Sequence, residues 1–137
     1  MNDRGSTLFE LVAVLAAIAA PGAAGARRCF SGRAGAERLA LVLRSAQARA
    51  QADCAVVRVA VAADGAYTVR ELRDDDVVWS RAGELGAAVT TNYPSGSLEF
   101  GPSGWPCLAG SASPRAGSFQ CGGFKVVVQL SGCVRCA

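Results

Sequence analysis

The stretch AERLALVLRSAQARAQADCAVVRVAVAADGAYTVREL, residues 36–72, changes its hydrophobic period once. Up to Asp53, apolar residues recur every three or four positions, which is typical of an amphipathic helix. The apolar helical positions are Leu39, Val42, Leu43, Ala46 and Ala50. From Ala55 onward apolar and polar residues alternate on both sides of Asp64-Gly65, a pair that favours a hairpin turn. The stretch therefore predicts one helix followed by two antiparallel strands.

The remainder of the chain continues the strand pattern in shorter pieces. Short strands are expected at residues 77–79, near the start of 97–106, at 118–121 and within 124–136, the last containing a tight turn near Ser131-Gly132. The segments RDDD (73–76), RAGELGAA (81–88) and CLAGSASPRAG (107–117) are predicted to be loops. The outline is an N-terminal helical region and an all-β remainder. Ahead of the amphipathic helix, Gly32 and Gly35 are expected to loosen or break the helical region.

Composition narrows the function classes. The chain has 137 residues, which is room for one domain and a short appendage, and a net charge of +3 that does not by itself imply nucleic acid. It has no histidine, so the commonest general base and the commonest zinc ligand are absent. No catalytic constellation stands out, so we expect no enzymatic activity, no cofactor and no metal. Six cysteines in so short a chain favour disulfides formed outside the cytoplasm.

The N-terminal segment is apolar except for one acid. Between residues 6 and 26 the only charge is Glu10, and Arg27-Arg28 follow at once. A span of 21 residues is long enough to cross a bilayer as a helix, although Pro21 predicts a kink. A cleaved secretory signal, with AAPGAAGA (19–26) as its cleavage region, is the alternative. Glu10 at the front of the apolar centre argues against that alternative.

The segment GSTLFE, residues 5–10, resembles the cleavage and methylation signature of type IV prepilins and type II secretion pseudopilins. The resemblance implies that prepilin peptidase cuts after Gly5 and that Ser6, where the family usually has Phe, becomes the methylated N-terminus. Thr7, Leu8 and Glu10 then match the positions of the signature that act in assembly. A carboxylate among lipid tails needs a partner, and the new amine of a neighbouring subunit would supply one to Glu10.

Four later segments are similar to the H-type minor pseudopilins, the GspH/FimT group. They are RSAQARAQ (44–51), VRVAVAADGAYTV (57–69), LEFGPSGWP (98–106) and FKVVVQLSGCVR (124–135). The resemblance implies a pilin-like α+β fold, in which a long N-terminal helix packs on a C-terminal antiparallel sheet domain. Its parts are a leader at 1–5, a transmembrane and assembly helix at 6–26, an amphipathic helix at 27–54 and a β domain at 55–137.

The function implied by the resemblance is structural. The chain would be a minor pilin or pseudopilin of a type IV pilus or a type II secretion pseudopilus. Its partners would be the prepilin peptidase, other major and minor pilins or pseudopilins, and the bacterial inner membrane, which it would cross once with its globular domain outside the cytoplasm. After assembly it would belong to the filament. A FimT-like pilin that binds DNA for uptake and a secreted disulfide-rich domain with an ordinary signal remain alternatives.

The helical region is rich in arginine. It holds six arginines against Glu37 and Asp53, and this excess could meet anionic headgroups or, in the uptake alternative, DNA. The arginines are Arg27, Arg28, Arg33, Arg38, Arg44 and Arg49. The acidic run 74–76 is predicted to be a solvated turn rather than a calcium loop. Trp79 and Trp105 are expected in the core or packed under loops.

Four of the six cysteines lie in the last third of the chain. Cys107, Cys121, Cys133 and Cys136 are candidates for structural disulfides, with Cys107–Cys121 the preferred pair. A zinc site from the same four residues and a redox site at Cys133-x-x-Cys136 are the weaker alternatives. Cys29 and Cys54 flank the predicted helix, so they lie farther apart than the ~7 Å between Cα atoms that a disulfide permits.

Overall fold

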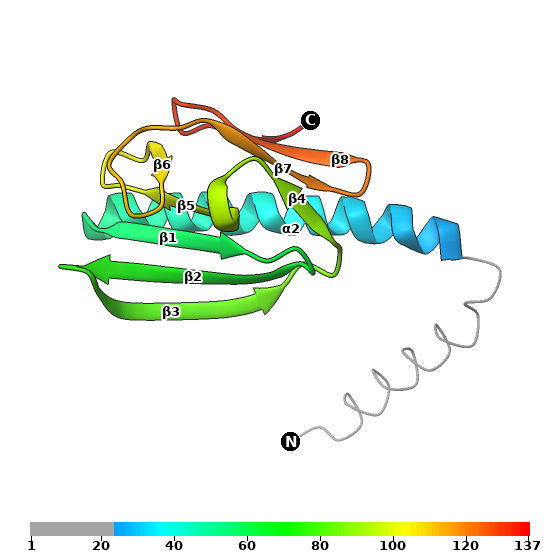
Figure 1. Cartoon of the computed structure of the whole chain (residues 1–137), viewed down its shortest axis with the longest axis horizontal. Helices are drawn as coiled ribbons and strands as arrows, with labels where there is room; N and C mark the ends of the chain where they lie inside the picture. The colour runs from blue at the N-terminus through cyan, green and yellow to red at the C-terminus, as the bar shows by residue number, and fades with distance from the viewer. Residues whose placement is uncertain (1–23) are drawn as a thin grey trace, which may run out of the picture.

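The fold consists of one long helix laid across two antiparallel sheets (Figure 1). A computed structural model describes the backbone of residues 24–137 and the side chains of residues 31–137. Helix α2 spans Ala24–Asp53, and its first turns extend beyond the sheets. Both sheets contact the same helix, so α2 forms one wall of a shared core.

Helix α2 is continuous over 30 residues, so the break expected at Gly32 and Gly35 is wrong. The two glycines serve packing instead. A Cβ atom on Gly32 would lie 3.0 Å from the backbone oxygen of Cys121, and one on Gly35 would lie 3.1 Å from the Cβ of Ala87. Glycine inside a helix costs up to about 1 kcal/mol relative to alanine. Here it lets the helix backbone approach the neighbouring chain segments more closely than any side chain would allow.

The five-stranded sheet contains the predicted hairpin. Its strands are β1 (Val56–Val61), β2 (Ala66–Arg73), β3 (Asp76–Glu84), β5 (Ser97–Phe100) and β6 (Pro106–Leu108), in the order β3-β2-β1-β5-β6. The turn at Asp64-Gly65 is confirmed: Gly65 has a φ of 96° and donates its N–H to the Ala62 carbonyl at 3.0 Å. β1 lies at the centre of the sheet, where its alternating valines face the core.

Strand β3 corrects the sequence prediction. The sequence predicts a strand only at 77–79, yet β3 has nine residues and takes in Asp76 from the segment predicted as a loop before it and residues 81–84 from the one after it. Asp74 and Asp75 are exposed, as predicted, and both have positive φ, so they form a two-residue turn between β2 and β3. Ala and Gly at positions 82 and 83 have low strand propensity, but pairing with β2 overrides it. Strand β6, expected to be loop, was missed as well.

The four-stranded sheet is built from the second half of the chain. Its order is β4-β7-β8-β9, with β4 at Val89–Thr91, β7 at Gly117–Cys121, β8 at Phe124–Val128 and β9 at Val134–Cys136. A short 3-10 helix, η2 (Pro94–Gly96), leads from β4 back to β5 in the other sheet. The predicted turn at Ser131-Gly132 is confirmed, because Gly132 donates to the Gln129 carbonyl at 2.9 Å.

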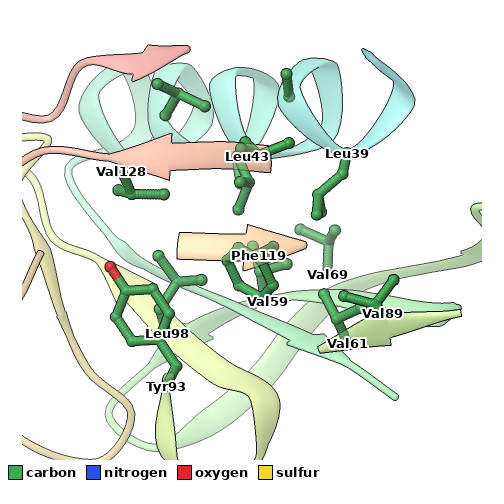
Figure 2. Packing of buried hydrophobic residues seen from close by; sticks show 14 of the residues in the cluster. Leu39, Leu43, Val59, Val61, Val69, Val89, Tyr93, Leu98, Phe119 and Val128 are labelled. Atoms are coloured by element: carbon green, nitrogen blue, oxygen red, sulfur yellow. The ribbon is translucent and has the colours of Figure 1, made fainter. Parts of the chain in front are cut away.

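The core lies between α2 and the two sheets (Figure 2). Leu39 and Leu43 are fully buried and meet side chains from both sheets. Phe119 stacks against Tyr93 with ring centroids 5.5 Å apart, and the Tyr93 hydroxyl donates to the Arg115 carbonyl at 2.9 Å. Four of the five helical apolar positions predicted from the sequence are buried, and the fifth, Val42, is half-buried.

Two leucines of α2 test this assignment of the core. Leu43→Ala should lower the free energy of unfolding by about 2–5 kcal/mol, because it opens a cavity in a well-packed interior. Leu41 is 64% exposed on the same helix, so Leu41→Ala should change stability by less than about 0.5 kcal/mol. Denaturant unfolding of the full chain measures both. Equal losses for the two variants would contradict this packing.

Candidate functional site

The described part of the chain contains no cluster of titratable side chains arranged for catalysis or metal binding. Within residues 31–137 no three His, Cys, Asp or Glu side chains lie together as metal ligands. The predicted cleavage and assembly residues Gly5, Ser6, Thr7, Leu8 and Glu10 lie outside the described residues. Among the helices described, none is long and apolar enough to cross a membrane. The candidate surfaces are therefore the polar sides of α2 and what lies beside them.

One polar side of α2 holds the loops and strand β9 in place. Arg44 donates through Nε and Nη2 to the Val134 carbonyl, at 3.1 and 2.7 Å. Gln47 donates through Nε2 to the carbonyls of Gly104 and Gly132, at 2.7 and 2.8 Å. Both glycines are buried, so Gln47 satisfies two carbonyls that water does not reach readily. These contacts fix the rotation of the helix about its own axis.

The remaining described arginines of α2 also have partners within the chain. Arg38 donates to the Glu84 carbonyl at 2.9 Å, and Arg33 pairs with Glu37 at 3.1 Å. The arginines of α2 from Arg33 to Arg49 thus all contact carboxylates or carbonyls of this chain. Arg27 and Arg28 have side chains outside the described set.

A partly buried ionic cluster joins α2 to β2 and β3. The Arg49 guanidinium lies over the Trp79 ring, 3.7 Å from its centroid, which is a cation–π contact. Its Nε lies 3.4 Å from Oε1 of Glu71 and 3.7 Å from Oδ2 of Asp53. Glu71 is only 3% exposed, because it occupies an inward position two residues after the buried Val69. This inward position in the alternating pattern of β2 is the sequence signal for the cluster, which the interpretation of the sequence above does not include.

The carboxyl group of Glu71 titrates abnormally. Hydrogen bonding with the Asp53 side chain raises the pKa of Glu71, and burial and the negative charge of Asp53 raise it further. The charges of Arg49 and Arg73 oppose this shift without cancelling it. Asp53 and Glu71 therefore share Arg49 as their cationic partner. Because the pKa of Glu71 is raised, folding favours its protonated form.

Beside this cluster lies a groove of about 450 Å³ between α2 and the outer part of β2 and β3. We call it the Arg81 groove; its walls include Arg38, Leu41, Arg49, Tyr67, Trp79 and Arg81. Trp79 is half-buried, which agrees with the packing role predicted for it. The groove combines aromatic and aliphatic walls with three guanidinium groups.

A second cleft, of about 570 Å³, lies at the far end of the five-stranded sheet. Within it Glu99 is 8% exposed, accepts from Nε of Arg58 at 2.8 Å and from the Gly110 N–H at 2.9 Å. Trp105, which also lines this cleft, is 53% exposed, so its predicted place in the core or under a loop is wrong. The Glu99 carboxylate in this cleft is therefore already hydrogen-bonded within the chain, to Arg58 and Gly110, which indicates a structural role.

The cysteines do not form the expected staple. Cys54, Cys107, Cys121, Cys133 and Cys136 are all free thiols. The preferred Cys107–Cys121 disulfide is absent: Cys107 lies on β6 of the five-stranded sheet and Cys121 on β7 of the four-stranded sheet. Burial raises the pKa of the Cys121 thiol, which packs under α2 near Gly35 and thus acts as a small apolar side chain.

Comparison with solved structures identifies the architecture. The chain matches a crystal structure of the type IV minor pilin FimU of Pseudomonas aeruginosa with a TM-score of 0.62 and 14% identity, over 77% of this chain and 91% of that one. A second crystal form of FimU matches with a TM-score of 0.56 and 13% identity, over 77% and 87% of the respective chains. The chain has a pilin-like fold. The expected packing of an N-terminal helix on antiparallel sheets is thereby confirmed.

Sequence comparisons add nothing to this structural likeness. No protein-family model matches the chain. No curated protein matches it either. At 13–14% identity the structural likeness establishes the pilin-like fold and leaves the function to be argued from the chain itself.

Gln47 offers a test of the helix rotation. Gln47→Ala leaves two buried carbonyls without a donor and should cost about 1–3 kcal/mol of stability. The matched control is Gln51→Ala, because Gln51 makes a single exposed contact of 3.4 Å with the Ser103 carbonyl. Chemical denaturation should separate the two variants clearly. A control as damaging as the Gln47 variant would refute the assigned role.

The shifted Glu71 predicts a pH dependence of stability. A pKa raised by folding means that the folded state holds the proton more tightly. The resulting stabilisation is complete below the ordinary value of 4.5 and is lost as pH rises through the raised pKa. The wild type should therefore gain stability relative to Glu71→Gln as pH falls from neutral to about 4.5, as thermal melting of the full chain would show. Glu84→Gln, an exposed change on β3, is the control and should show no comparable trend.

Proposed function

We propose that this chain is a minor pilin or pseudopilin of the H type, cut by prepilin peptidase after Gly5 and assembled into a type IV pilus or type II secretion pseudopilus. The observation that carries the proposal is the helix. α2 runs unbroken from Ala24 into a pilin-like fold, and the chain immediately ahead of it carries the prepilin-like signature at 5–10. A motif and a fold, obtained from different parts of the chain, point to the same class of protein.

The geometry of α2 suits a subunit that is held by its N-terminal end. Its apolar face, from Ala36 to Ala50, is buried against the two sheets, whereas its first turns project past them (Figure 1). In the proposed subunit, residues 6–26 would lead into the first turn of α2, anchor the chain in the inner membrane and then pack in the filament. The β domain would stand outside the cytoplasm. Arg27-Arg28 would lie where the helix leaves the headgroup region.

Glu10 supplies the proposed assembly interaction. A carboxylate among lipid tails is costly to insert, by up to about 3 kcal/mol at the centre of a bilayer and by less toward its surface, nearer which Glu10 would lie. Cleavage after Gly5 would create an α-amino group on Ser6, and the amine of one subunit could pair with Glu10 of the next. The pair would relieve the cost only in the assembled filament. Assembly would thus be favoured over the isolated membrane-anchored state.

The DNA-uptake alternative gains no support from the arginines of α2. From Arg33 to Arg49 each arginine of the helix contacts a carboxylate or a carbonyl of this chain. Side chains that already hold the fold together are poor candidates for a phosphate-binding stripe, which needs free cations.

N-terminal sequencing of the mature protein tests the processing step. The proposal predicts a mature chain that begins at Ser6. A start between residues 24 and 27 would instead show an ordinary signal peptide and would refute the pilin assignment.

Glu10→Ala tests the assembly step separately. The variant should still be cut after Gly5, because the cleavage site is intact, but its incorporation into sheared filaments should fall about tenfold or more with the loss of the charge pair. Glu37→Ala, which removes an exposed acid of α2, is the control and should be incorporated normally. Normal incorporation of the Glu10 variant would contradict the pairing.

A further inference from the structure

Strand β3 leaves one long edge of the five-stranded sheet open. It is the terminal strand in the order β3-β2-β1-β5-β6 and pairs only with β2. Within the described chain, β3 is contacted from outside the β2 pairing by two residues of α2: Arg49 lies over the Trp79 ring, and Arg38 donates to the Glu84 carbonyl at the end of the strand. Across the described chain no other segment covers this edge. An open edge carries a row of unpaired backbone donors and acceptors, which is a template for another strand.

The side chains at this edge are unusually apolar. Val77 and Val78 of β3 are 52% and 50% exposed. Leu41 of α2, which lines the Arg81 groove, is 64% exposed. Val78 is the extra residue of a bulge, because Val77 pairs with Leu72 and Trp79 with Glu71. Proteins protect free edges with charged side chains, proline, bulges or a covering segment. β3 contains neither lysine nor proline, its acidic residues Asp76 and Glu84 stand only at its two ends, and its bulge interrupts the edge at Val78 alone. A surface of this kind is typical of an interface.

The charge at this edge specifies what can bind. Trp79 and Arg81 pair with Glu71 and Val69, whose side chains are buried, so both residues lie on the helix side of the sheet and line the groove. Among the described residues Arg49 already has carboxylate partners and Arg38 a carbonyl partner, while Arg81 has neither an ion pair nor a hydrogen bond from its guanidinium. The groove therefore offers one unused cation next to apolar walls. Its best complement is a carboxylate flanked by apolar side chains.

We propose that the outer edge of β3 and the Arg81 groove bind an extended acidic segment of a neighbouring filament subunit, which adds to the sheet as a further strand. This inference rests on the proposed function, since that function supplies the neighbouring subunit. Main-chain hydrogen bonds to β3 would provide affinity. Because side chains of a strand alternate, every second residue of the incoming segment would enter the groove, where one carboxylate meets Arg81 and an apolar neighbour lies between Trp79 and Leu41.

A peptide fits this surface better than a nucleic acid does. One face of the Trp79 ring is already covered by the Arg49 guanidinium, which leaves little of the ring for base stacking. A single free arginine is also too few for a phosphate backbone. An open strand edge, by contrast, is complementary to another peptide backbone.

Photo-crosslinking in the native host would test the proposal on the full chain. A photoreactive residue placed at Val78 should cross-link to an acidic, extended segment of another pilin-like subunit, with the site mapped by mass spectrometry of the cross-linked peptide. The same residue placed at Lys125, exposed on the other sheet, is the positional control and should not cross-link to that segment.

Two charge-reversed variants make the test specific. Arg81→Glu should lower the cross-link yield about tenfold, because it sets like charges against each other at the docking surface. Arg70→Glu makes the same change on β2, paired with Ser80 on the opposite face of the sheet, and should leave the yield within about twofold. Thermal melting should show both variants folded. Equal effects of the two substitutions would overturn the assignment of the groove.

The outcomes separate this inference from the proposed function. Leader cleavage and filament incorporation are measured in the same cells. A chain that is cut after Gly5 and incorporated, but gives no cross-link from position 78, overturns the docking proposal alone. Cross-links only to DNA, to lipid or to a second copy of this chain overturn it as well. Failure of cleavage and incorporation refutes the proposed function and, with it, the partner named here.

Discussion

A single helix must bury one apolar face against two sheets at once, and the rest of the structure follows from that constraint. The ridge of α2 is made mostly of alanine with two leucines, so the sheets can approach the helix axis closely. Gly32 and Gly35 extend this close contact toward the N-terminal end. Because small residues give little area each, larger side chains complete the core, and Leu39, Leu43, Phe100 and Phe119 are among the largest that are fully buried. Neither sheet could bury its inner face without the other and the helix.

Polar contacts then decide how the helix sits on those sheets. Because the buried face of α2 consists mostly of alanine, a small rotation of the helix about its axis would exchange one alanine contact for a similar one at little cost in free energy. Arg44 and Gln47 remove that freedom by binding carbonyls of the β8–β9 and β5–β6 regions. On the other side Arg49 ties α2 to Glu71 and Trp79. A buried ionic group contributes little net stability, but it penalises every alternative arrangement that would leave its charge unpaired.

The arrangement explains how a pilin-like fold can persist at 14% identity to FimU. Many sequences can form a helix of small residues packed on two antiparallel sheets, provided that they keep the hydrophobic period of the helix and the small residues where its backbone lies close to the sheets. The open β3 edge, the free guanidinium of Arg81 and the exposed valines beside it are not needed by the core. Under the proposed function, they are the features through which this subunit would select its neighbours.

The sequence by itself determined the features that depend on neighbours along the chain. The helical face of Leu39, Leu43 and Ala46 and the turns at Asp64-Gly65 and Ser131-Gly132 follow from local period and backbone freedom. Only the tertiary structure decided the course of the helix through Gly32, the nine-residue length of β3, the burial of Glu71 and the separation of Cys107 from Cys121. Each of these depends on chain segments that are distant in the sequence. Gly32 is required by the nearby Cys121 carbonyl, and the length of β3 by its pairing with β2. Glu71 is buried beside Arg49 of the helix, and the two cysteines lie on strands of different sheets. Period and turn chemistry are local, whereas close approach, pairing and burial exist only once the chain has folded.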